Sequence, residues 1–450
     1  MRVISKILFA AILLVTGCSH TPALTDLSVQ VGADANELRI PISVQFATDC
    51  QYYIEYWKNG DAKVERTSTY SSQACRGEAK LMFLSESTSY QFRVCALVDG
   101  EIATSETGSF TTGSLPIDVP RYSVTESDES IEIPGLILQM AAGSPGFVTF
   151  CNTDGEVLWY ERFEGAVRQA RYDQKTGTLL VNIGFRFSNT GDYQRVAAKT
   201  LMIDLKGNRL LELEAGESYL DYPHHEILRL EDGNILALHN TVRRFDLTSL
   251  GGNPDTEVFG EGITIFSPEG DVIWEWDCFS DLDVLNDPTV NPVSYAFDLI
   301  HANSVCMDSD GNLYISHNRL NEIWKIDYKT RRVLYRAKCD TDGIHGLESL
   351  APDKVICLDN GTNLQTSRAV IYDMDPLTGV PTTLMSVEYP KEYCSSNRSN
   401  VDYHPEEDMM MYCSTVRLGL IFTDLEGRIL RILKRNEISY RAYWFKSINY

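Results

Sequence analysis

The sequence predicts an all-β chain in which a small β-sandwich precedes a six-bladed β-propeller. Short strand-like runs separated by tight turns recur from residue 26 onward, and helical periodicity is almost absent. The chain has 450 residues, which is more than one hydrophobic core can enclose, so we expect at least two domains.

The composition narrows the class of protein. Hydrophobic residues make up 43% of the chain, which is enough for packed cores and argues against a disordered chain. Asp and Glu number 63 against 40 Lys and Arg, for a net charge of -23. This excess of acid repels phosphate backbones and anionic membrane surfaces, so it disfavours nucleic acid as a partner.

The first 17 residues resemble a bacterial lipoprotein signal. Arg2 and Lys6 precede an apolar run at 7–15 that is too short to span a bilayer, and small residues then lead to Cys18. We expect cleavage before Cys18, lipidation of that cysteine and a tether at 18–25. The protein would then be exported to the periplasm or outer membrane, held there only by its lipid anchor. An ordinary secretory signal followed by a chance cysteine is the alternative.

The remaining cysteines permit disulfides without proving any. Cys50 and Cys75 flank one predicted hairpin and are the only candidate pair. Four others lie within apolar strand-like runs, where a small buried side chain is the simpler interpretation: Cys151, Cys306, Cys357 and Cys413. No Cys or His spacing is typical of a zinc site.

Residues 26–113 show the pattern of an antiparallel sandwich. Short alternating strands are expected at 38–46, 51–57, 79–84, 89–97 and 108–112. Turn pairs such as Asn59-Gly60 separate them. The strand at 90–94 and the closing segment at 108–112 resemble a fibronectin type III domain, which serves as a spacer or docking module. Residues 114–120 are expected to form a linker.

Two hairpin types alternate along residues 121–450. The first occurs at 150–159, 202–211, 265–274, 326–335, 372–379 and 422–430. The second occurs at 174–181, 230–237, 307–315, 351–356 and 405–410. Turns of the first type recur about every 50 to 60 residues, which suits four-stranded units stacked radially as the six blades of a propeller. A parallel β-helix is disfavoured because its coils are shorter and lack these reverse turns.

Three histidines occupy the same place in successive repeats. His225, His301 and His345 each begin a predicted inner strand after a turn-rich segment. Inner strands of a propeller surround a central channel, so histidines in phase meet at one of its mouths. A single histidine at a strand end is usually just hydrogen-bonded there, but three in phase predict a shared site.

Several short motifs around these histidines resemble those of the bacterial arylsulfate sulfotransferases. They are found at 224–227, 231–238, 299–305, 321–327, 359–361, 367–369 and 440–443, in the order of that family. The resemblance implies an exported six-bladed propeller with a small N-terminal β domain. It also implies transfer of a sulfuryl group from a phenolic sulfate ester to a phenol, with neither a nucleotide sulfate donor nor a cofactor.

The resemblance also implies roles for individual residues. His345 takes the place of the nucleophile that becomes transiently sulfated, and His225 and His301 take the places of histidines that hold sulfate oxygens. Four further positions would bind substrate: His224, Asn303, Asn318 and Asn360. A neutral imidazole is a good nucleophile near pH 7, and cationic or N–H donors stabilise the charge on the peripheral oxygens of a loose transition state. Another histidine would protonate the phenolate.

The sequence departs from the family pattern at two positions. Arg319 is the candidate for a catalytic arginine, but counting back from Lys325 places the family's arginine at Asn318. Neighbouring strand residues point to opposite faces, so Arg319 would face away from the channel unless a bulge intervenes. Ile344 stands where the family has a glutamine.

Two alternative functions remain open from the sequence. The three histidines could hold copper or zinc, with Glu226 or Asp298 orienting them. The propeller could instead be a binding lipoprotein without catalysis, which the displaced arginine would permit. Four aromatic residues could line an acceptor slot, although packing between blades is the simpler role for each: Tyr222, Tyr295, Phe297 and Trp444.

Overall fold

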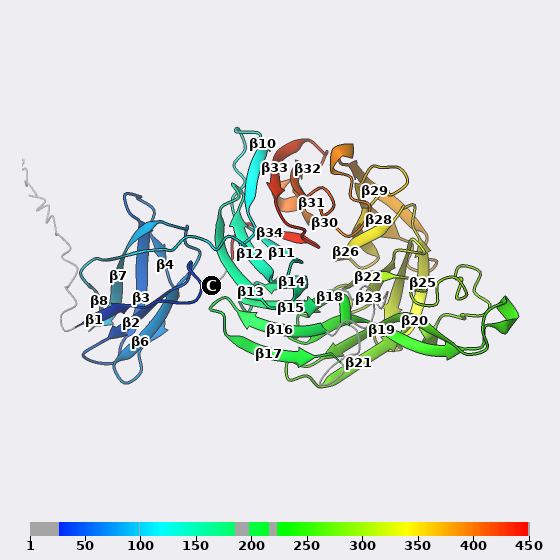
Figure 1. The fold of residues 1–450 in the computed structure, drawn as a ribbon, viewed down its shortest axis with the longest axis horizontal. Coiled ribbons are helices and arrows are strands. Elements are labelled where there is room, and N and C mark those ends of the chain that lie inside the picture. The colour runs from blue at the N-terminus through cyan, green and yellow to red at the C-terminus, as the bar shows by residue number, and fades with distance from the viewer. Residues whose placement is uncertain (1–26, 99, 185–197, 216–222, 449–450) are drawn as a thin grey trace, which may run out of the picture. The chain divides into compact units, whose positions relative to one another are not determined.

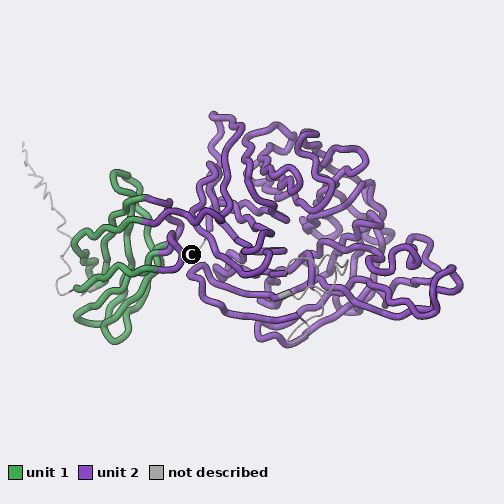
Figure 2. The backbone as a smooth tube through the Cα atoms, viewed as in Figure 1, with its two compact units in different colours: residues 1–33, 40–81, 88–111 green, residues 34–39, 82–87, 112–450 purple. Residues whose placement is uncertain are grey.

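The computed structural model describes residues 27–98, 100–184, 198–215 and 223–448, and it forms two compact units. The first lies within residues 1–33, 40–81 and 88–111, and the second comprises 34–39, 82–87 and 112–450 (Figure 2). The signal segment and Cys18 lie outside the described residues. No helix in the described ranges is long and apolar enough to cross a membrane.

The first unit consists of antiparallel strands in two sheets. Its strands are β1 (Ser28–Val31), β2 (Ile40–Gln45), β3 (Gln51–Lys58), β4 (Glu65–Arg66), β5 (Tyr70–Ser71), β6 (Arg76–Leu81), β7 (Ser89–Val98), β8 (Glu101–Thr104) and β9 (Gly108–Thr111). One sheet has the order β1-β2-β6 and the other β4-β3-β7-β8, with β5 on β3 and β9 on β7. The ring of Tyr52 on β3 lies directly against Gly77 on β6, so the two sheets pack face to face.

The candidate disulfide between Cys50 and Cys75 is not formed: both cysteines are free thiols. Cys75 has a left-handed backbone (φ 62°) in the turn before β6, and its thiol donates to the carbonyl of Ala47 at 3.6 Å. The turn therefore directs this side chain to a backbone acceptor.

The described part of the second unit contains six antiparallel sheets. In order they are β13-β12-β11-β34, β14-β15-β16-β17, β18-β19-β20-β21, β22-β23-β24-β25, β26-β27-β28-β29 and β10-β33-β32-β31-β30 (Figure 1). The described residues are thus all-β apart from four short 3-10 helices: η1 (Thr248–Leu250), η2 (Cys278–Ser280), η3 (Lys391–Tyr393) and η4 (Pro405–Glu407).

Strand β10 (Tyr122–Ser127) comes first in the chain and joins the last sheet. The next strands, which build the first three sheets, are β11 (Leu136–Ala141), β12 (Gly146–Asn152), β13 (Val157–Phe163), β14 (Ala166–Asp173), β15 (Thr178–Gly184), β16 (Ala198–Asp204), β17 (Arg209–Glu214), β18 (Pro223–Arg229), β19 (Ile235–Phe245), β20 (Thr256–Phe266) and β21 (Val272–Asp277). Those of the other sheets are β22 (Ala302–Met307), β23 (Leu313–His317), β24 (Glu322–Asp327), β25 (Arg332–Lys338), β26 (Ile344–Ala351), β27 (Lys354–Asp359), β28 (Arg368–Met374), β29 (Pro381–Glu388), β30 (Asn400–His404), β31 (Met409–Ser414), β32 (Gly419–Asp424), β33 (Ile429–Arg435) and β34 (Ala442–Phe445).

The two turn types that recur in the sequence join different strand pairs. Turns of the first type, such as the one at Gly207 (φ 85°), join the two outer strands of a sheet. Turns of the second type, such as the one at Gly233 (φ 90°), join the two inner strands. Both glycines occupy left-handed positions that a side chain would strain.

The two ends of the second unit share sheets. The C-terminal strand β34 pairs with β11, with Tyr443 opposite Leu138, and β10 pairs with β33. Each innermost strand lies near the innermost strand of the next sheet, in the order β14, β18, β22, β26, β30 and β34. Strand β11, which pairs with β34, lies near β14 and so returns to the start of this series. The inner strands therefore surround a common centre (Figure 1).

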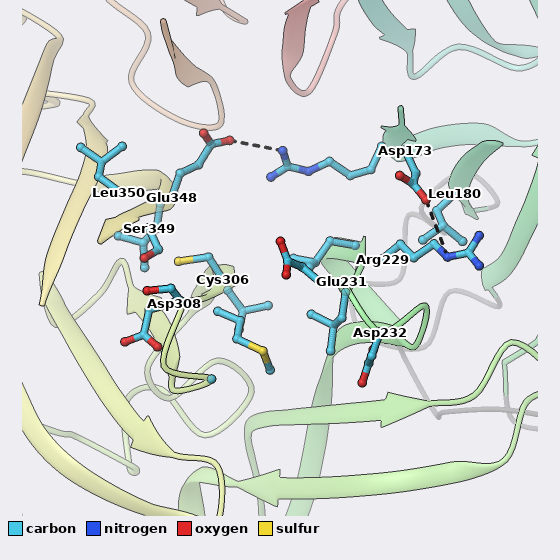
Figure 3. Close-up of a pocket in the computed structure, with 18 of the residues that line it drawn as sticks. Asp173, Leu180, Arg229, Glu231, Asp232, Cys306, Asp308, Glu348, Ser349 and Leu350 are labelled. Carbon is cyan, nitrogen blue, oxygen red and sulfur yellow. Dashed lines mark hydrogen bonds and ion pairs between the residues drawn. The ribbon is translucent and has the colours of Figure 1, made fainter. Parts of the chain in front are cut away.

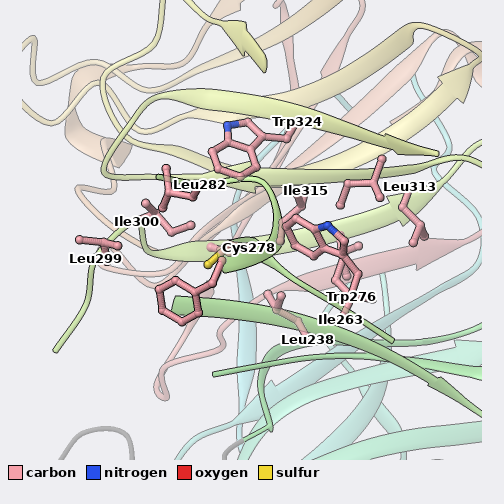
Figure 4. Packing of buried hydrophobic residues seen from close by; sticks show 14 of the residues in the cluster. Leu238, Ile263, Trp276, Cys278, Leu282, Leu299, Ile300, Leu313, Ile315 and Trp324 are labelled. Carbon is pink, nitrogen blue, oxygen red and sulfur yellow. The ribbon is translucent and has the colours of Figure 1, made fainter. Parts of the chain in front are cut away.

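Large apolar side chains fill the space between adjacent sheets. In one cluster Trp276 of β21 meets Trp324 of β24, with ring centres 6.4 Å apart and Leu238 and Ile263 beside them (Figure 4). Burial of such side chains is the main stabilising contribution, at about 1.5 to 3 kcal/mol each. These clusters fix where the inner strands lie.

The pairing of β34 with β11 gives a stability prediction. Trp444 is 2% exposed, packs on Phe422 at 5.9 Å and donates through Nε1 to Pro134 O. Replacing it with alanine leaves a cavity, so Trp444→Ala is expected to lower the free energy of unfolding in urea by about 3 to 5 kcal/mol. Leu377→Ala is the control, because Leu377 is 88% exposed. Equal unfolding midpoints for the two variants would contradict a stabilising role for β34.

Candidate active site

The three histidines in phase converge at one end of the inner strands. His225 lies near the start of β18, His301 directly precedes β22, and His345 is the second residue of β26. The ring centres of His225 and His301 are 5.6 Å apart. His345 is close enough to both that its charge lowers the pKa of His225 and that the charge of His301 lowers the pKa of His345. The predicted meeting of imidazoles from separate sheets is therefore present in the structure.

A backbone irregularity recurs at this place. His225 and His301 have positive φ angles of 55° and 54°, and Gly346 beside His345 has φ 59°. The pairing register shifts at the same point in β18, β22 and β26. A Cβ on Gly346 would lie 2.8 Å from Asn400, so this position requires glycine. Left-handed backbone at non-glycine residues is uncommon and clusters at functional sites.

The hydrogen bonds of His345 fix its protonation and tautomer. Asn360 donates through Nδ2 to the carbonyls of Ser395 and Arg398, so its Oδ1 must face His345 Nδ1, 2.5 Å away. His345 Nδ1 therefore carries the proton. The backbone N–H of Arg398 donates to His345 Nε2 at 3.2 Å, so Nε2 carries the lone pair. Burial, aided by the charges of His301 and Arg441, lowers the pKa of His345 to about 3.

The asparagines predicted to bind substrate have other partners in this structure. Asn303 is fully buried; it donates to the carbonyl of Ile344 at 2.7 Å and accepts from Ser316. Asn318 Nδ2 donates to the same carbonyl at 3.1 Å and lies 3.3 Å from His345 Nδ1. Both side chains hold the start of β26, and with it His345, against the neighbouring sheet.

His224 and His225 form a pair through their Nδ1 atoms, which are 2.6 Å apart, so one ring donates to the other. His224 Nε2 lies 3.0 Å from Glu261, and Glu261 also accepts the backbone N–H of Ala302. Burial and the charges of neighbouring groups lower the pKa of His225 well below its usual value, so His225 is neutral near pH 7. His224 thus supports His225 from the side of β20.

His301 has the opposite electrostatic character. Its Nδ1 lies 2.9 Å from Asp298 Oδ2. Burial works against the charged form, but the hydrogen bond and charge of Asp298 raise the pKa of His301 above its usual value. His301 is therefore the member of the cluster whose charged form is favoured. Environments that push pKa values apart are typical of acid and nucleophile pairs.

Arg319 does not point at the three rings. Its Nε donates to the carbonyl of Asp298 and its Nη2 to the carboxylate at 2.7 Å, and it stacks on Tyr295 at 4.0 Å. Asn318, its neighbour in the turn after β23, lies beside His345 instead. Arg319 thus reaches His301 only through Asp298, and its assignment as a direct sulfate ligand stays a prediction.

A buried ionic layer lies beneath the histidines. The carboxylate of Glu226 accepts hydrogen bonds from Arg441, from Gln169 at 2.9 Å and from Arg171 at 3.2 Å. Arg171 also reaches Glu348 at 3.2 Å. Burial favours the neutral form of Glu226, but the charges of Arg171 and Arg441 keep its pKa below the usual value. Arg441 further donates to Asn303 O and Ser304 Oγ.

An open cavity of about 860 Å³ lies at the other end of the same inner strands. It is lined by the ends of β14, β18, β22 and β26, including Glu231, Asp232 and Glu348 (Figure 3). Acidic side chains outnumber its arginines, so this mouth repels a sulfate ester. The histidine end is the candidate site for an anionic substrate.

Aromatic residues differ in their positions relative to the site. Tyr295 and Phe297 belong to the segment that carries Asp298, and Phe297 is 73% exposed and contacts Phe259 at 6.1 Å. Trp444 is buried in the core, which fits the packing role that the sequence favoured. Tyr222 lies outside the described residues. No group of three or more His, Cys, Asp or Glu side chains within the described ranges has an arrangement that could hold a metal ion.

The family model for arylsulfotransferases (ASST) matches residues 70–341. The chain belongs to the arylsulfotransferase family. The match includes His225, His301 and Arg319, whereas His345 and Asn360 follow its end. The family implies a sulfotransferase that takes a phenolic sulfate donor and a phenol acceptor. No curated protein matches the chain.

Among solved structures, this arylsulfotransferase is similar to a protein of unknown function from Bacteroides caccae, with 11% identity, TM-score 0.46, and coverage of 70% of this chain and 99% of that one. It is also similar to a β-propeller domain from Myceliophteria thermophila, with 12% identity, TM-score 0.39, and coverage of 69% and 88%. A third is the WD40 β-propeller domain of Doa1, with 10% identity, TM-score 0.34, and coverage of 71% and 98%.

Sequence reasoning missed several residues of this site. Arg441 lies within the 440–443 motif, but its position beneath the histidines depends on β34 entering the first sheet. Arg171 and Glu348 carry no motif at all. Glu261 lies within β20, far along the chain from His224, which it contacts. The sequence signal for Arg441 is a charged residue within a short run of apolar residues, since such a residue is buried only with a partner.

The ionic layer gives a second stability prediction. Glu226 and Arg441 are both fully buried, so removing the carboxylate charge leaves two guanidinium groups without their shared counter-ion. Glu226→Gln is expected to cost about 3 to 5 kcal/mol of unfolding free energy, measured by urea denaturation. Glu231→Gln is the control, because the side chain of Glu231 is 96% exposed. A Glu226→Gln protein as stable as the wild type would show that the layer is not an ionic network.

Proposed function

We propose that the protein transfers a sulfuryl group from a phenolic sulfate ester to a phenol through a sulfohistidine at His345, without a nucleotide sulfate donor. The observation that carries this proposal is the state of His345. It is buried and neutral, its Nδ1–H is held by Asn360, and its Nε2 lone pair is at the site. Family membership supplies the class of reaction.

In the first step, the Nε2 lone pair of His345 forms a bond to sulfur and the bond from sulfur to the phenolic oxygen breaks. The electron pair leaves with that oxygen, which takes a proton from His301. The ring of His345 then carries positive charge, and Asn360 Oδ1 stabilises it by accepting the Nδ1–H. Covalent catalysis splits one difficult transfer between two phenols into two similar steps.

In the second step the same groups act in reverse. His301, now neutral, accepts the proton of the acceptor phenol as its oxygen attacks sulfur, and the nitrogen–sulfur bond returns its electron pair to His345 Nε2. Asp298 stabilises the charged form of His301 in the first step and is its hydrogen-bond partner in both. His225 is placed 5.6 Å from His301 to donate to a peripheral oxygen of the sulfuryl group.

We further interpret the six sheets as the blades of a six-bladed β-propeller and the first unit as a fibronectin type III-like sandwich. The cyclic approach of the inner strands and the pairing of β34 with β11 support the first interpretation. The signal segment supports an exported lipoprotein anchored through Cys18 in the periplasm or outer membrane. Mass spectrometry of the N-terminal peptide from a membrane fraction tests this anchor.

The proposed nucleophile gives an activity prediction. Wild-type protein with a nitrophenyl sulfate and phenol is expected to release nitrophenolate and form phenyl sulfate, and His345→Ala is expected to do neither. Intact mass after donor alone is expected to show one sulfuryl adduct, mapped to His345. His404→Gln is the matched control. His404 ends β30 and contacts Asp402, whereas Asn400 at the other end of that strand lies next to Gly346 and His345. If the wild-type protein transfers no sulfuryl group and behaves like His345→Ala, the result would favour a binding protein without catalysis.

The raised pKa of His301 gives a pH prediction. Protonated His301 is the acid of the first step, so single-turnover sulfation of His345 by phenyl sulfate falls as pH rises through this pKa. Asp298→Asn removes the charge that raises the pKa, so the basic limb is expected to move to lower pH. A nitrophenyl sulfate needs less protonation of its leaving group and is expected to show a smaller shift. Unchanged profiles with both donors would exclude His301 as the acid.

A further inference from the structure

The proposed reaction needs a positive charge that the predicted residues do not supply. A sulfuryl group in transfer carries negative charge on its peripheral oxygens, and cationic donors stabilise it. His225 and His345 are neutral near pH 7, and Asn318 beside His345 is a neutral amide. The charge of His301 is balanced by Asp298, which also binds Arg319.

Buried arginines near the site are also engaged. Arg441 is held by Glu226, the carbonyl of Asn303 and Ser304 Oγ. Arg171 is held by Glu226 and Glu348. Their charges support the local field, but their guanidinium groups are committed to these partners.

Arg398 differs from these arginines. Its half-buried guanidinium makes neither a hydrogen bond nor an ion pair with any residue that the structure describes. Its backbone, in contrast, is fixed: the N–H donates to His345 Nε2 at 3.2 Å and the carbonyl accepts from Asn360 Nδ2 at 3.1 Å. The next residue, Ser399, donates its N–H to Tyr440 O at 3.1 Å. The loop thus holds Arg398 next to the nucleophilic nitrogen.

The surroundings of Arg398 suit an anion. Burial and the positive charge of Arg398 together lower the pKa of Arg168 on β14, which places two cations in one neighbourhood. The hydroxyl of Tyr440 is buried without a hydrogen-bond partner among the described residues, and its ring lies 5.6 Å from His225. An anion bound at Arg398 would offset the repulsion between these two positive charges.

We propose that Arg398 is the catalytic residue that binds the peripheral oxygens of the sulfuryl group, with both its guanidinium and its backbone N–H. The backbone N–H donates to Nε2 while that nitrogen holds a lone pair. Once Nε2 bonds to sulfur, the N–H lies beside a sulfuryl oxygen and can donate to it. Arg398 would thereby take the role that the sequence assigned to Arg319. This proposal rests on the proposed sulfotransferase function.

The first test measures kcat for sulfuryl transfer from a nitrophenyl sulfate to phenol. Arg398→Ala is expected to lose about 10²- to 10³-fold, the scale for removal of one oxyanion donor, and Arg398→Lys to lose less. Free guanidinium ion is expected to restore part of the activity of Arg398→Ala. Arg417→Gln, at an exposed position between β31 and β32, is the matched control and should match wild type. Activity of Arg398→Ala equal to wild type, or a loss that guanidinium does not restore in a normally folded variant, overturns the proposal.

The second test does not depend on turnover. Inorganic sulfate is expected to raise the unfolding temperature of wild type and Arg417→Gln above that in chloride of equal ionic strength, and to leave Arg398→Ala unchanged. If wild type shows no transfer but this difference is observed, the proposed function fails while the anion-binding role of Arg398 stands. If sulfate stabilises Arg398→Ala as much as wild type, the role of Arg398 fails even where transfer occurs.

Discussion

The buried pairing of Glu226 with Arg441 is the constraint on which the site depends. It joins β18 to the residue before β34, and through the carbonyl of Asn303 it also joins β22. Two charges taken out of water need further hydrogen bonds to be stable together, and here Gln169 and Arg171 also donate to the carboxylate of Glu226. The strands that carry His225 and His301 are therefore held in register by charge as well as by apolar packing.

This layer also sets the chemistry above it. Positive charge beneath the site adds to burial in disfavouring a second proton on His345, so the nucleophile keeps its lone pair. His301 escapes the same influence because Asp298 contacts it directly. One fold position, repeated in neighbouring sheets, thus holds one imidazole neutral and favours the charged form of another, through the partners that each ring meets.

Features that repeat along the sequence could be predicted from it, whereas contacts between segments far apart in the chain could not. Turn spacing predicted the hairpins, and the phase of His225, His301 and His345 predicted their meeting, because both follow from a repeated unit. Arg319 lies in the turn after β23 and contacts Asp298, so strand alternation does not decide its direction. The roles of Arg441 and Arg398 depend on segments far apart in the chain, so no local pattern could reveal them. The sequence left open whether Cys50 and Cys75 pair, and both are free thiols in the structure, because proximity to one hairpin does not fix the direction of a thiol.

The left-handed residues at the strand starts connect these observations. In a regular strand, successive side chains point to opposite faces, so a histidine and its neighbour would not both face the same site. The positive φ at His225 and the shift in register beside it interrupt the alternation, which lets His224 contact His225 and lets the following residue, Glu226, reach the layer beneath. At Gly346 the same irregularity allows Asn400 to approach, which brings the Arg398 loop onto His345. The local backbone strain therefore helps to place His345 against its hydrogen-bond partners Asn360 and Arg398.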